Sequence, residues 1–210
     1  MEDLVFYEEI VKKFQNSKRF THTLGVAKEA YALGQIFLPE KSDKLRLAGI
    51  LHDITKEFSV ERQLNLCDEY GIIINKNELV PKLLHAKTGC EFARRLLGKE
   101  VVDDEIYNAI LYHTTGRKDM TLFESLIYLA DYIEEGRSFV DCIELRKYFY
   151  KEIENATSYA ERLEVLASTM ILSFDLTFKN LIEEGKSIDY DTVTARSFFL
   201  KNKNKISEVF

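Results

Sequence analysis

The stretch Gly49–Phe58, GILHDITKEF, decides how the rest of the chain is interpreted. It places His52 and Asp53 directly after a short apolar run, and Lys56 follows three positions after Asp53. A helix built for burial holds an unpaired charge only at a high cost in free energy. The adjacent imidazole and carboxylate therefore need solvent, polar partners or a metal ion.

On both sides of this stretch, and along the rest of the chain, the spacing of apolar residues is typical of helices. Only two prolines and nine glycines interrupt 210 residues, which favours long helices over many short strands. We expect helices over residues 4–14, 19–37, from a cap at Ser42, and over 59–70, 83–97, 103–113, 121–132, 143–150, 158–184 and from 191 onward. The best strand-like run is Ile72–Ile74, and the polar end of the chain, residues 201–210, is expected to fray.

The predicted fold class is therefore all-α. Residues 1–140 are expected to form a catalytic core, and residues 141–210 a helical extension packed on that core as one structural unit. A length of 210 residues suits one large domain of this kind.

The bulk composition excludes several classes of protein. A formal net charge of −6 argues against an electrostatic nucleic-acid surface, although a local metal could still attract a small anionic substrate. The three cysteines, Cys67, Cys90 and Cys142, form no CxxC pair, so a reduced cytoplasmic protein is expected. The acidic N-terminus does not resemble a signal peptide, and we expect no membrane span.

The chain has four histidines, and each lies in or at the end of a different predicted helix: His22, His52, His85 and His113. A single histidine is more often an ordinary core or surface residue than a metal ligand. Helices in a bundle can, however, direct side chains from several elements into one cavity. His22 precedes Gly25 by three residues and His85 precedes Gly89 by four, so a glycine on each histidine face would let a neighbour approach closely.

Two aspartates complete a candidate set of metal ligands. His52 and Asp53 project about 100° apart on a helix, so they can bind one ion jointly while the second carboxylate oxygen reaches another ion. Asp131 lies within the apolar segment SLIYLADYIEEGR, residues 125–137, where a carboxylate needs a partner unless it lies at a solvated edge. Imidazoles with a bridging carboxylate commonly bind iron, manganese or related ions.

The order H…HD…H…H…D resembles that of the HD-domain metal-dependent phosphohydrolases. The matching segments are RFTHTLGVAKEA, LAGILHDITKE, HAKTG, ILYHTTG and LADYIEEGR, which together span about residues 18–137. In this order and spacing they are similar to the YqeK-type members, the symmetrical bis(5′-nucleosyl)-tetraphosphate hydrolases. One departure is that Tyr132 and Glu135 stand where the family often has Lys and Pro.

The resemblance implies two metal ions. His22, His52, Asp53 and Asp131 would hold one ion, while His85 and His113 would hold the other, with Asp53 bridging. Iron is the metal it implies, and imidazole and carboxylate ligands also suit Mn, Co, Ni and Zn.

The implied reaction is symmetrical cleavage of diadenosine tetraphosphate to two ADP, by attack of a metal-activated hydroxide on phosphorus. The same metal core also serves HD-domain nucleotidases and phosphodiesterases that act on other nucleotides. A third interpretation is a helical binding protein with a single structural metal, although such zinc sites are commonly rich in cysteine.

Several residues near these ligands are candidates for contact with a phosphate. Lys56 follows His52 by four residues and Asp53 by three, so we place it with Asp53 in the catalytic set; the alternative is a surface lysine at a helix end. The other substrate-binding candidates are Arg19, Thr88, Thr114 and Arg137, for which capping or solvent exposure is the alternative. Phe198 and Phe199, expected to be exposed, would suit a homodimer.

Overall fold

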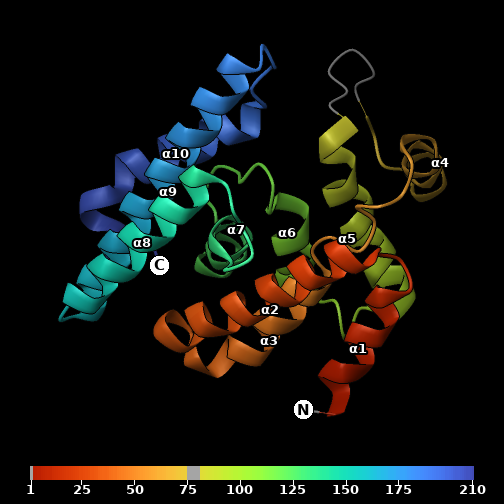
Figure 1. Cartoon of the computed structure of the whole chain (residues 1–210), viewed down its shortest axis with the longest axis horizontal. Helices are drawn as coiled ribbons and strands as arrows, with labels where there is room; N and C mark the ends of the chain where they lie inside the picture. Colours follow the sequence, from red (N-terminus) through yellow and green to blue (C-terminus); the bar gives the residue numbers. More distant parts are fainter. Residues whose placement is uncertain (1, 75–80) are drawn as a thin grey trace.

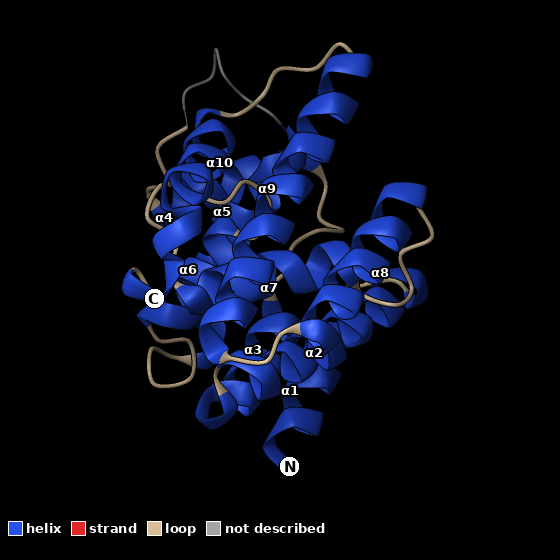
Figure 2. Ribbon diagram, turned by 90° about the vertical axis from the view of Figure 1, so that its left-hand side faces the viewer, coloured by secondary structure: helices blue, strands red, loops and turns tan. Residues whose placement is uncertain are grey.

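The computed structural model describes residues 2–74 and 81–210 of the chain. Within these residues the structure consists of helices and loops and contains no strand (Figure 2), which confirms the all-α class. The α-helices are α1 (Glu2–Lys12), α2 (Ser17–Phe37), α3 (Ser42–Leu51), α4 (Val60–Tyr70), α5 (Leu84–Leu97), α6 (Asp104–Tyr112), α7 (Leu122–Ile133), α8 (Val140–Asn155), α9 (Tyr159–Glu183) and α10 (Tyr190–Asn202). Short 3-10 helices are η1 (Pro39–Lys41), η3 (Pro81–Leu83) and η4 (Lys203–Glu208).

Polar capping residues set most of the helix starts. Thr121 and Ser158 each form a capping box, in which the side chain accepts a backbone N–H and a glutamate three residues later reaches back. Asn16 caps α2 by accepting a hydrogen bond from the backbone N–H of Arg19 at 2.9 Å. Gly71 ends α4 with φ of 69°, a left-handed conformation that glycine adopts at little cost.

Two local expectations are wrong. Residues Ile72–Ile74 form no strand, because the run is short and follows the end of α4 directly. Ser42 does not cap α3 with its side chain; Lys41 is the capping position, and the Ser42 hydroxyl donates to the carbonyl of Pro39 at 2.9 Å.

The C-terminal end of the chain also differs from expectation. Residues Lys203–Glu208 form η4 rather than a frayed tail, and Ile206 is buried. Phe198 and Phe199 are buried as well, with Phe199 fully inaccessible, so they offer no exposed aromatic surface to a partner. The apolar side chains of α10 and η4 pack on α9. The polar residues around them in the sequence made this packing hard to predict.

Helices α2 and α3 pack with their backbones in close contact. A Cβ atom added to Gly49 would lie 2.8 Å from the Cα of Ala27, and one added to Gly34 would lie 2.8 Å from the Cα of Ser42. Real side chains do not approach a backbone so closely, so glycine is required at both crossings. This pair of helices brings His22 beside His52.

Helix α7 lies at the centre of the molecule, between the α2–α3 pair and the α8–α10 helices (Figure 1). Its side chains are buried on nearly all sides, as expected for a helix that is apolar all round. The Tyr128 ring lies 4.8 Å from the Phe174 ring of α9, measured between centroids, so the C-terminal helices pack directly on α7. The division into a core and an extension stays a prediction.

Helix α9 is long and apolar enough, by length and composition alone, to cross a membrane. In the structure its apolar face is buried: Leu163, Leu166, Met170 and Phe174 have almost no exposed area. The helix packs on α7, α8 and α10.

Because α2 packs closely on α3, we expect alanine to be tolerated less well at Gly49 than at Gly89. Gly49→Ala should lower the free energy of unfolding by about 1–3 kcal/mol, because the new methyl group meets the α2 backbone. Gly89→Ala is the matched control in α5, since its Cβ would come no closer than 3.4 Å to any neighbour. Urea denaturation measures both; equal stability of the two variants would contradict the close α2–α3 contact.

Candidate metal centre

The four histidines converge on one point from four different helical elements. His22 lies in the second turn of α2, His52 and His113 are the C-caps of α3 and α6, and His85 lies in the first turn of α5. The ring of His52 lies 5.5 Å from the ring of His22 and 5.1 Å from that of His113, between centroids. His52, His85 and His113 are almost completely buried.

Each imidazole is oriented through its Nδ1 atom. In three of them Nδ1 lies 2.6–2.8 Å from the backbone carbonyl three residues earlier: His52 on Gly49, His85 on Lys82 and His113 on Ile110. A carbonyl oxygen only accepts hydrogen bonds, so the proton of each neutral ring must be on Nδ1. The Nε2 atoms are therefore left as lone-pair donors that point to the centre, the usual arrangement for histidine ligands of metals.

The contact between His85 and His113 is unfavourable without a cation. Their Nε2 atoms lie 3.1 Å apart, and both rings already use Nδ1 as the proton donor. Burial lowers the pKa of His85 to about 4, despite the nearby Asp53 carboxylate, so this ring is neutral near pH 7. When both rings are neutral, their lone pairs face each other, and a positive charge beside these nitrogens, such as the Lys56 ammonium 3.1 Å from His85 Nε2 or a metal ion, relieves the repulsion.

Asp53 lies between two pairs of imidazoles. Its Oδ1 atom is 3.2 Å from His85 Nε2 and 3.5 Å from His113 Nε2. Its Oδ2 atom is 3.4 Å from His52 Nε2 and 3.9 Å from His22 Nε2. Burial alone would raise the pKa of Asp53; imidazoles that carry a proton on Nε2 hold it well below its ordinary value, and a metal ion would supply the same positive charge when the rings are neutral. One carboxylate oxygen thus faces each histidine pair.

Asp131 completes the half of the centre that contains His22 and His52. Its Oδ1 atom lies 3.0 Å from His22 Nε2 and 3.9 Å from His52 Nε2. Burial alone would raise the pKa of Asp131; Arg137, whose Nη2 atom lies 2.5 Å from the same oxygen, and the two histidines keep it well below its ordinary value. The carboxylate is therefore ionised and directed at the imidazoles.

The donor set fits metal binding. His22 Nε2, His52 Nε2 and Asp53 Oδ1 are buried without a hydrogen-bond partner, although each lies close to other ligand atoms. Ligands about 2.1 Å from a common ion lie about 3.0–3.4 Å from one another, close to the shorter separations here. Three overlapping groups have donor atoms within 4.8 Å of one another: His22, His52 and Asp53; His52, His113 and Asp131; Asp53, His85 and His113.

Glu134 orients His22, a role that the sequence analysis missed. Its Oε1 atom lies 3.1 Å from His22 Nδ1, and its Oε2 atom accepts the Gly136 N–H at 2.6 Å. Burial opposes protonation of His22, but its contacts with Asp131 and Glu134 raise its pKa to about 9. A carboxylate, and not a backbone carbonyl, is the partner of Nδ1 here because His22 lies inside a helix, where the carbonyls already accept the hydrogen bonds of the helix.

Gly25 makes room for that carboxylate. A Cβ atom at Gly25 would lie 2.3 Å from Glu134 Oε2, so no other residue fits there without moving Glu134. The spacing of His22 and Gly25 was the signal in the sequence that something approaches this face of α2. The identity of the approaching group was not visible, because Glu134 and Glu135 look like a solvated helix end.

Helix α8 fixes the loop that carries Glu134. The Arg146 guanidinium donates to the carbonyl of Ile133 at 2.5 Å and to that of Arg137 at 3.1 Å, and it also donates to the carbonyl of Glu134. The C-terminal helices therefore help to position the metal centre from outside it.

Lys56 and Arg19 also reach the centre. Lys56 Nζ lies 3.1 Å from His85 Nε2, and burial lowers the pKa of this lysine although Asp53 and Asp131 oppose the shift. Arg19 donates to Asp53 Oδ2 at 2.8 Å and lies 3.7 Å from a Glu57 oxygen. The cationic side chains of Lys56 and Arg19 therefore both lie next to the predicted metal ligands.

The two threonine candidates differ. Thr88 is fully buried, where its hydroxyl donates to the carbonyl of Leu84 at 3.0 Å and contacts Thr55 Oγ1 at 2.9 Å. It therefore cannot touch a substrate in this conformation, because its face of α5 packs against Thr55. The hydroxyl of Thr114 is buried beside His113 without a hydrogen-bond partner, so it stays a candidate.

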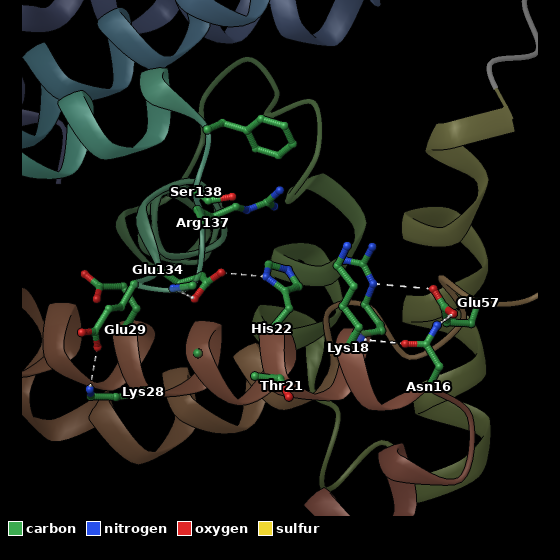
Figure 3. A pocket seen from close by; sticks show the side chains of 15 residues that line it. Asn16, Lys18, Thr21, His22, Lys28, Glu29, Glu57, Glu134, Arg137 and Ser138 are labelled. Atoms are coloured by element: carbon green, nitrogen blue, oxygen red, sulfur yellow. Dashed lines mark hydrogen bonds and ion pairs between the residues drawn. The ribbon is translucent and has the colours of Figure 1, made fainter.

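A cavity of about 940 Å³ opens onto this centre along α2 and the α7–α8 loop. Figure 3 shows His22 in its middle, with Glu134 and Arg137 on one side and Lys18 on the other. Arg19 and Arg137 both line it, so two guanidinium groups flank the histidine that faces solvent. Such a volume accommodates a small organic ligand, and the guanidinium groups favour phosphate or carboxylate.

The sequence pattern of the HD domain matches residues 19–136, which include all six candidate ligands. The chain belongs to the HD domain family. HD-domain hydrolases are metal-dependent, and the His and Asp cluster of this HD domain is able to bind metal.

Relatives of this HD domain protein carry more specific names. The symmetrical bis(5′-nucleosyl)-tetraphosphatase of Bacillus subtilis (strain 168) is 36% identical over 146 residues, covering 70% of this chain and 77% of the relative. The protein of the same name in Staphylococcus aureus is 32% identical over 145 residues, covering 69% and 73%. The crystal structure of an HD superfamily hydrolase from Clostridium acetobutylicum, described as involved in NAD metabolism, has a TM-score of 0.80 at 33% identity and covers 94% and 96% of the two chains.

Removal of the carboxylate behind His22 should weaken metal binding by this HD domain. We expect Glu134→Ala to lower the metal affinity about 10- to 100-fold, because His22 loses the partner that fixes its ring. Glu135→Ala is the matched control, since the Glu135 side chain is 84% exposed and pairs only with Lys28. Calorimetric titration with Mn²⁺ measures both variants; equal affinities would contradict the orienting role of Glu134.

Proposed function

We propose that the protein is a metal-dependent hydrolase that cleaves diadenosine tetraphosphate symmetrically into two ADP. The observation that carries this proposal is the division of four imidazole Nε2 atoms between the two oxygens of Asp53, next to a cavity that His22 and two arginines line. The names of the Bacillus and Staphylococcus relatives support the choice of substrate.

The centre binds two metal ions in this proposal. His22, His52, Asp53 and Asp131 hold one, while His85, His113 and Asp53 hold the other. Iron is the proposed metal, and Mn, Co, Ni or Zn suit the same imidazole and carboxylate ligands. When bound, the ions supply activation of a water molecule and neutralise charge on the phosphate oxygens.

The cationic side chains bind and orient the polyphosphate. Arg19 and Arg137 lie on the cavity wall on both sides of His22, and each guanidinium group can donate two parallel hydrogen bonds to a phosphate. Two such groups hold the chain of phosphates across the centre and resist its rotation. Symmetrical cleavage requires this, because the attacked phosphorus must be one of the two inner ones.

Lys56 is placed to stabilise the charge that develops during cleavage. It is held beside His85 and near the Asp53 carboxylate, in a partly enclosed site where a fixed positive charge acts strongly on nearby oxygens. The departing ADP is a weakly basic leaving group, so electrostatic stabilisation suffices without a strong acid. Asp53 acts as a shared metal ligand in this proposal and does not act as a base.

The cysteines and the net charge support a cell compartment and a class of ligand. All three cysteines are free thiols and buried, which suits a reducing cytoplasm where nucleotides are turned over. The proposed ligand is a nucleotide and not nucleic acid, since the net charge of −6 disfavours nucleic acid. The surface for a homodimer is not the Phe198–Phe199 pair, which is buried.

A second function within the same enzyme class is a nucleotidase or phosphodiesterase for another nucleotide. The specific observation in its favour is the Clostridium acetobutylicum structure, which covers nearly the whole chain and is described in terms of NAD metabolism. A scaffold with one structural metal is disfavoured, because structural zinc sites close with four ligands and this centre presents six.

Product analysis separates these functions. Metal-loaded protein incubated with diadenosine tetraphosphate should yield ADP as the sole nucleotide product on anion-exchange chromatography. AMP with ATP would reject symmetrical cleavage. Faster turnover of nucleoside monophosphates or NAD than of the tetraphosphate would favour the second function.

Two substitutions distinguish ligand from catalytic cation. Asp53→Asn should remove turnover and lower the bound metal, because both halves of the centre lose a charged ligand. Lys56→Ala should keep the metal but lower kcat about 100-fold, the typical effect of losing one fixed electrostatic group. Lys87→Ala, an exposed lysine on α5, is the control. Elemental analysis with steady-state kinetics measures all three, and full activity in Asp53→Asn would end the bridging assignment.

A further inference from the structure

The loop between α7 and α8 places an exposed aromatic ring on the wall of the cavity. Phe139 is 68% exposed and lines the same cavity as His22 and Arg137. Burying a phenylalanine side chain stabilises a protein by about 1.5–3 kcal/mol, and this residue forgoes most of that gain. Other phenylalanines are fully buried, namely Phe37, Phe123, Phe149, Phe174 and Phe199.

Position 139 also departs from the local rule for helix starts. Phe139 is the N-cap residue of α8 and makes no side-chain capping hydrogen bond. A serine, threonine, asparagine or aspartate there would stabilise the helix by about 1 kcal/mol. The chain uses such residues to cap other helices: Asn16, Ser59, Asp103, Thr121, Ser158 and Asp189. A residue that is unfavourable both as a cap and in its exposure indicates a functional role.

The loop that carries Phe139 is held firmly. Arg146 donates to two of its backbone carbonyls, those of Glu134 and Arg137, and to that of Ile133 at the end of α7, while the backbone N–H of Arg137 donates to the Glu134 carbonyl at 3.0 Å. Phe139 follows Arg137 by two residues, which separates their Cα atoms by about 7 Å at most. The phosphate-binding side chain and the ring are therefore close enough to contact one nucleotide together.

We propose that Phe139 is the stacking platform for one nucleobase of the nucleotide bound in this cavity. This inference rests on the proposed function, since it needs a nucleotide whose phosphates lie at the metal centre. Stacking on an aromatic ring contributes about 1–3 kcal/mol per base and tolerates any base, because every base has a π-face. Phe139 thus binds the nucleoside part of the ligand, whereas Arg19 and Arg137 bind its phosphates.

Fluorescence tests the contact without reference to turnover. The chain contains no tryptophan, so Phe139→Trp introduces the sole tryptophan at the cavity wall, and excitation at wavelengths that tyrosine does not absorb isolates its emission. Titration of the metal-loaded variant with ADP should quench this emission saturably, whereas pyrophosphate, which lacks a base, should not. Phe6→Trp is the matched control, since Phe6 is 60% exposed on α1 and does not line the cavity; ADP should leave its emission unchanged.

Kinetics of two further variants test the same point. Phe139→Ala should raise KM for diadenosine tetraphosphate about 5- to 150-fold with little change in kcat or metal content. Phe139→Leu should resemble Phe139→Ala, because it restores apolar area but not the ring.

Three results would overturn the stacking role. These are equal quenching by ADP and pyrophosphate, unchanged Trp emission while calorimetry detects bound ADP, and an Ala variant whose sedimentation mass changes while KM does not. The last result would assign Phe139 to a contact between protein chains. If the natural chain bound ADP but did not cleave the tetraphosphate, the proposed reaction would fail while the fluorescence result still tested the base contact.

Discussion

The buried Asp53 carboxylate, shared between two pairs of imidazoles, is the constraint on which the rest of the structure depends. Its Oδ1 atom faces His85 and His113, and its Oδ2 atom faces His22 and His52. A buried carboxylate is stable only with positive charge nearby. Arg19 supplies part of that charge in the protein itself, and the geometry of the donors leaves room for cations to supply the rest.

The helices fix the orientation of the imidazole rings as well as their positions around Asp53. His52 and His113 stand at helix C-termini, where carbonyls three residues back accept their Nδ1 protons. His22 has no such carbonyl free inside its helix and uses Glu134 instead. Glu134 in turn depends on the space at Gly25 and on the loop held by Arg146. The C-terminal helices therefore contribute to a site whose ligands all lie before them in the chain.

The sequence was sufficient to predict the helices and the candidate ligands, because caps, apolar spacing and the order of histidines are local signals. The HD domain match and the all-α fold confirm the family and the class. Features set by tertiary packing were missed or misjudged. Thr88 shares a helix face with His85 but packs against Thr55, Phe199 is inside the core, and Glu134 resembles a solvated helix end. The assignment of each ligand to an ion stays a prediction.

Anomalous diffraction from crystals loaded with iron or manganese, recorded at the absorption edge of the metal, tests the two-ion arrangement most directly. The account predicts two peaks on opposite sides of Asp53, one beside the Nε2 atoms of His22 and His52 and the other beside those of His85 and His113. A single peak with four ligands, or peaks away from these nitrogens, would contradict it.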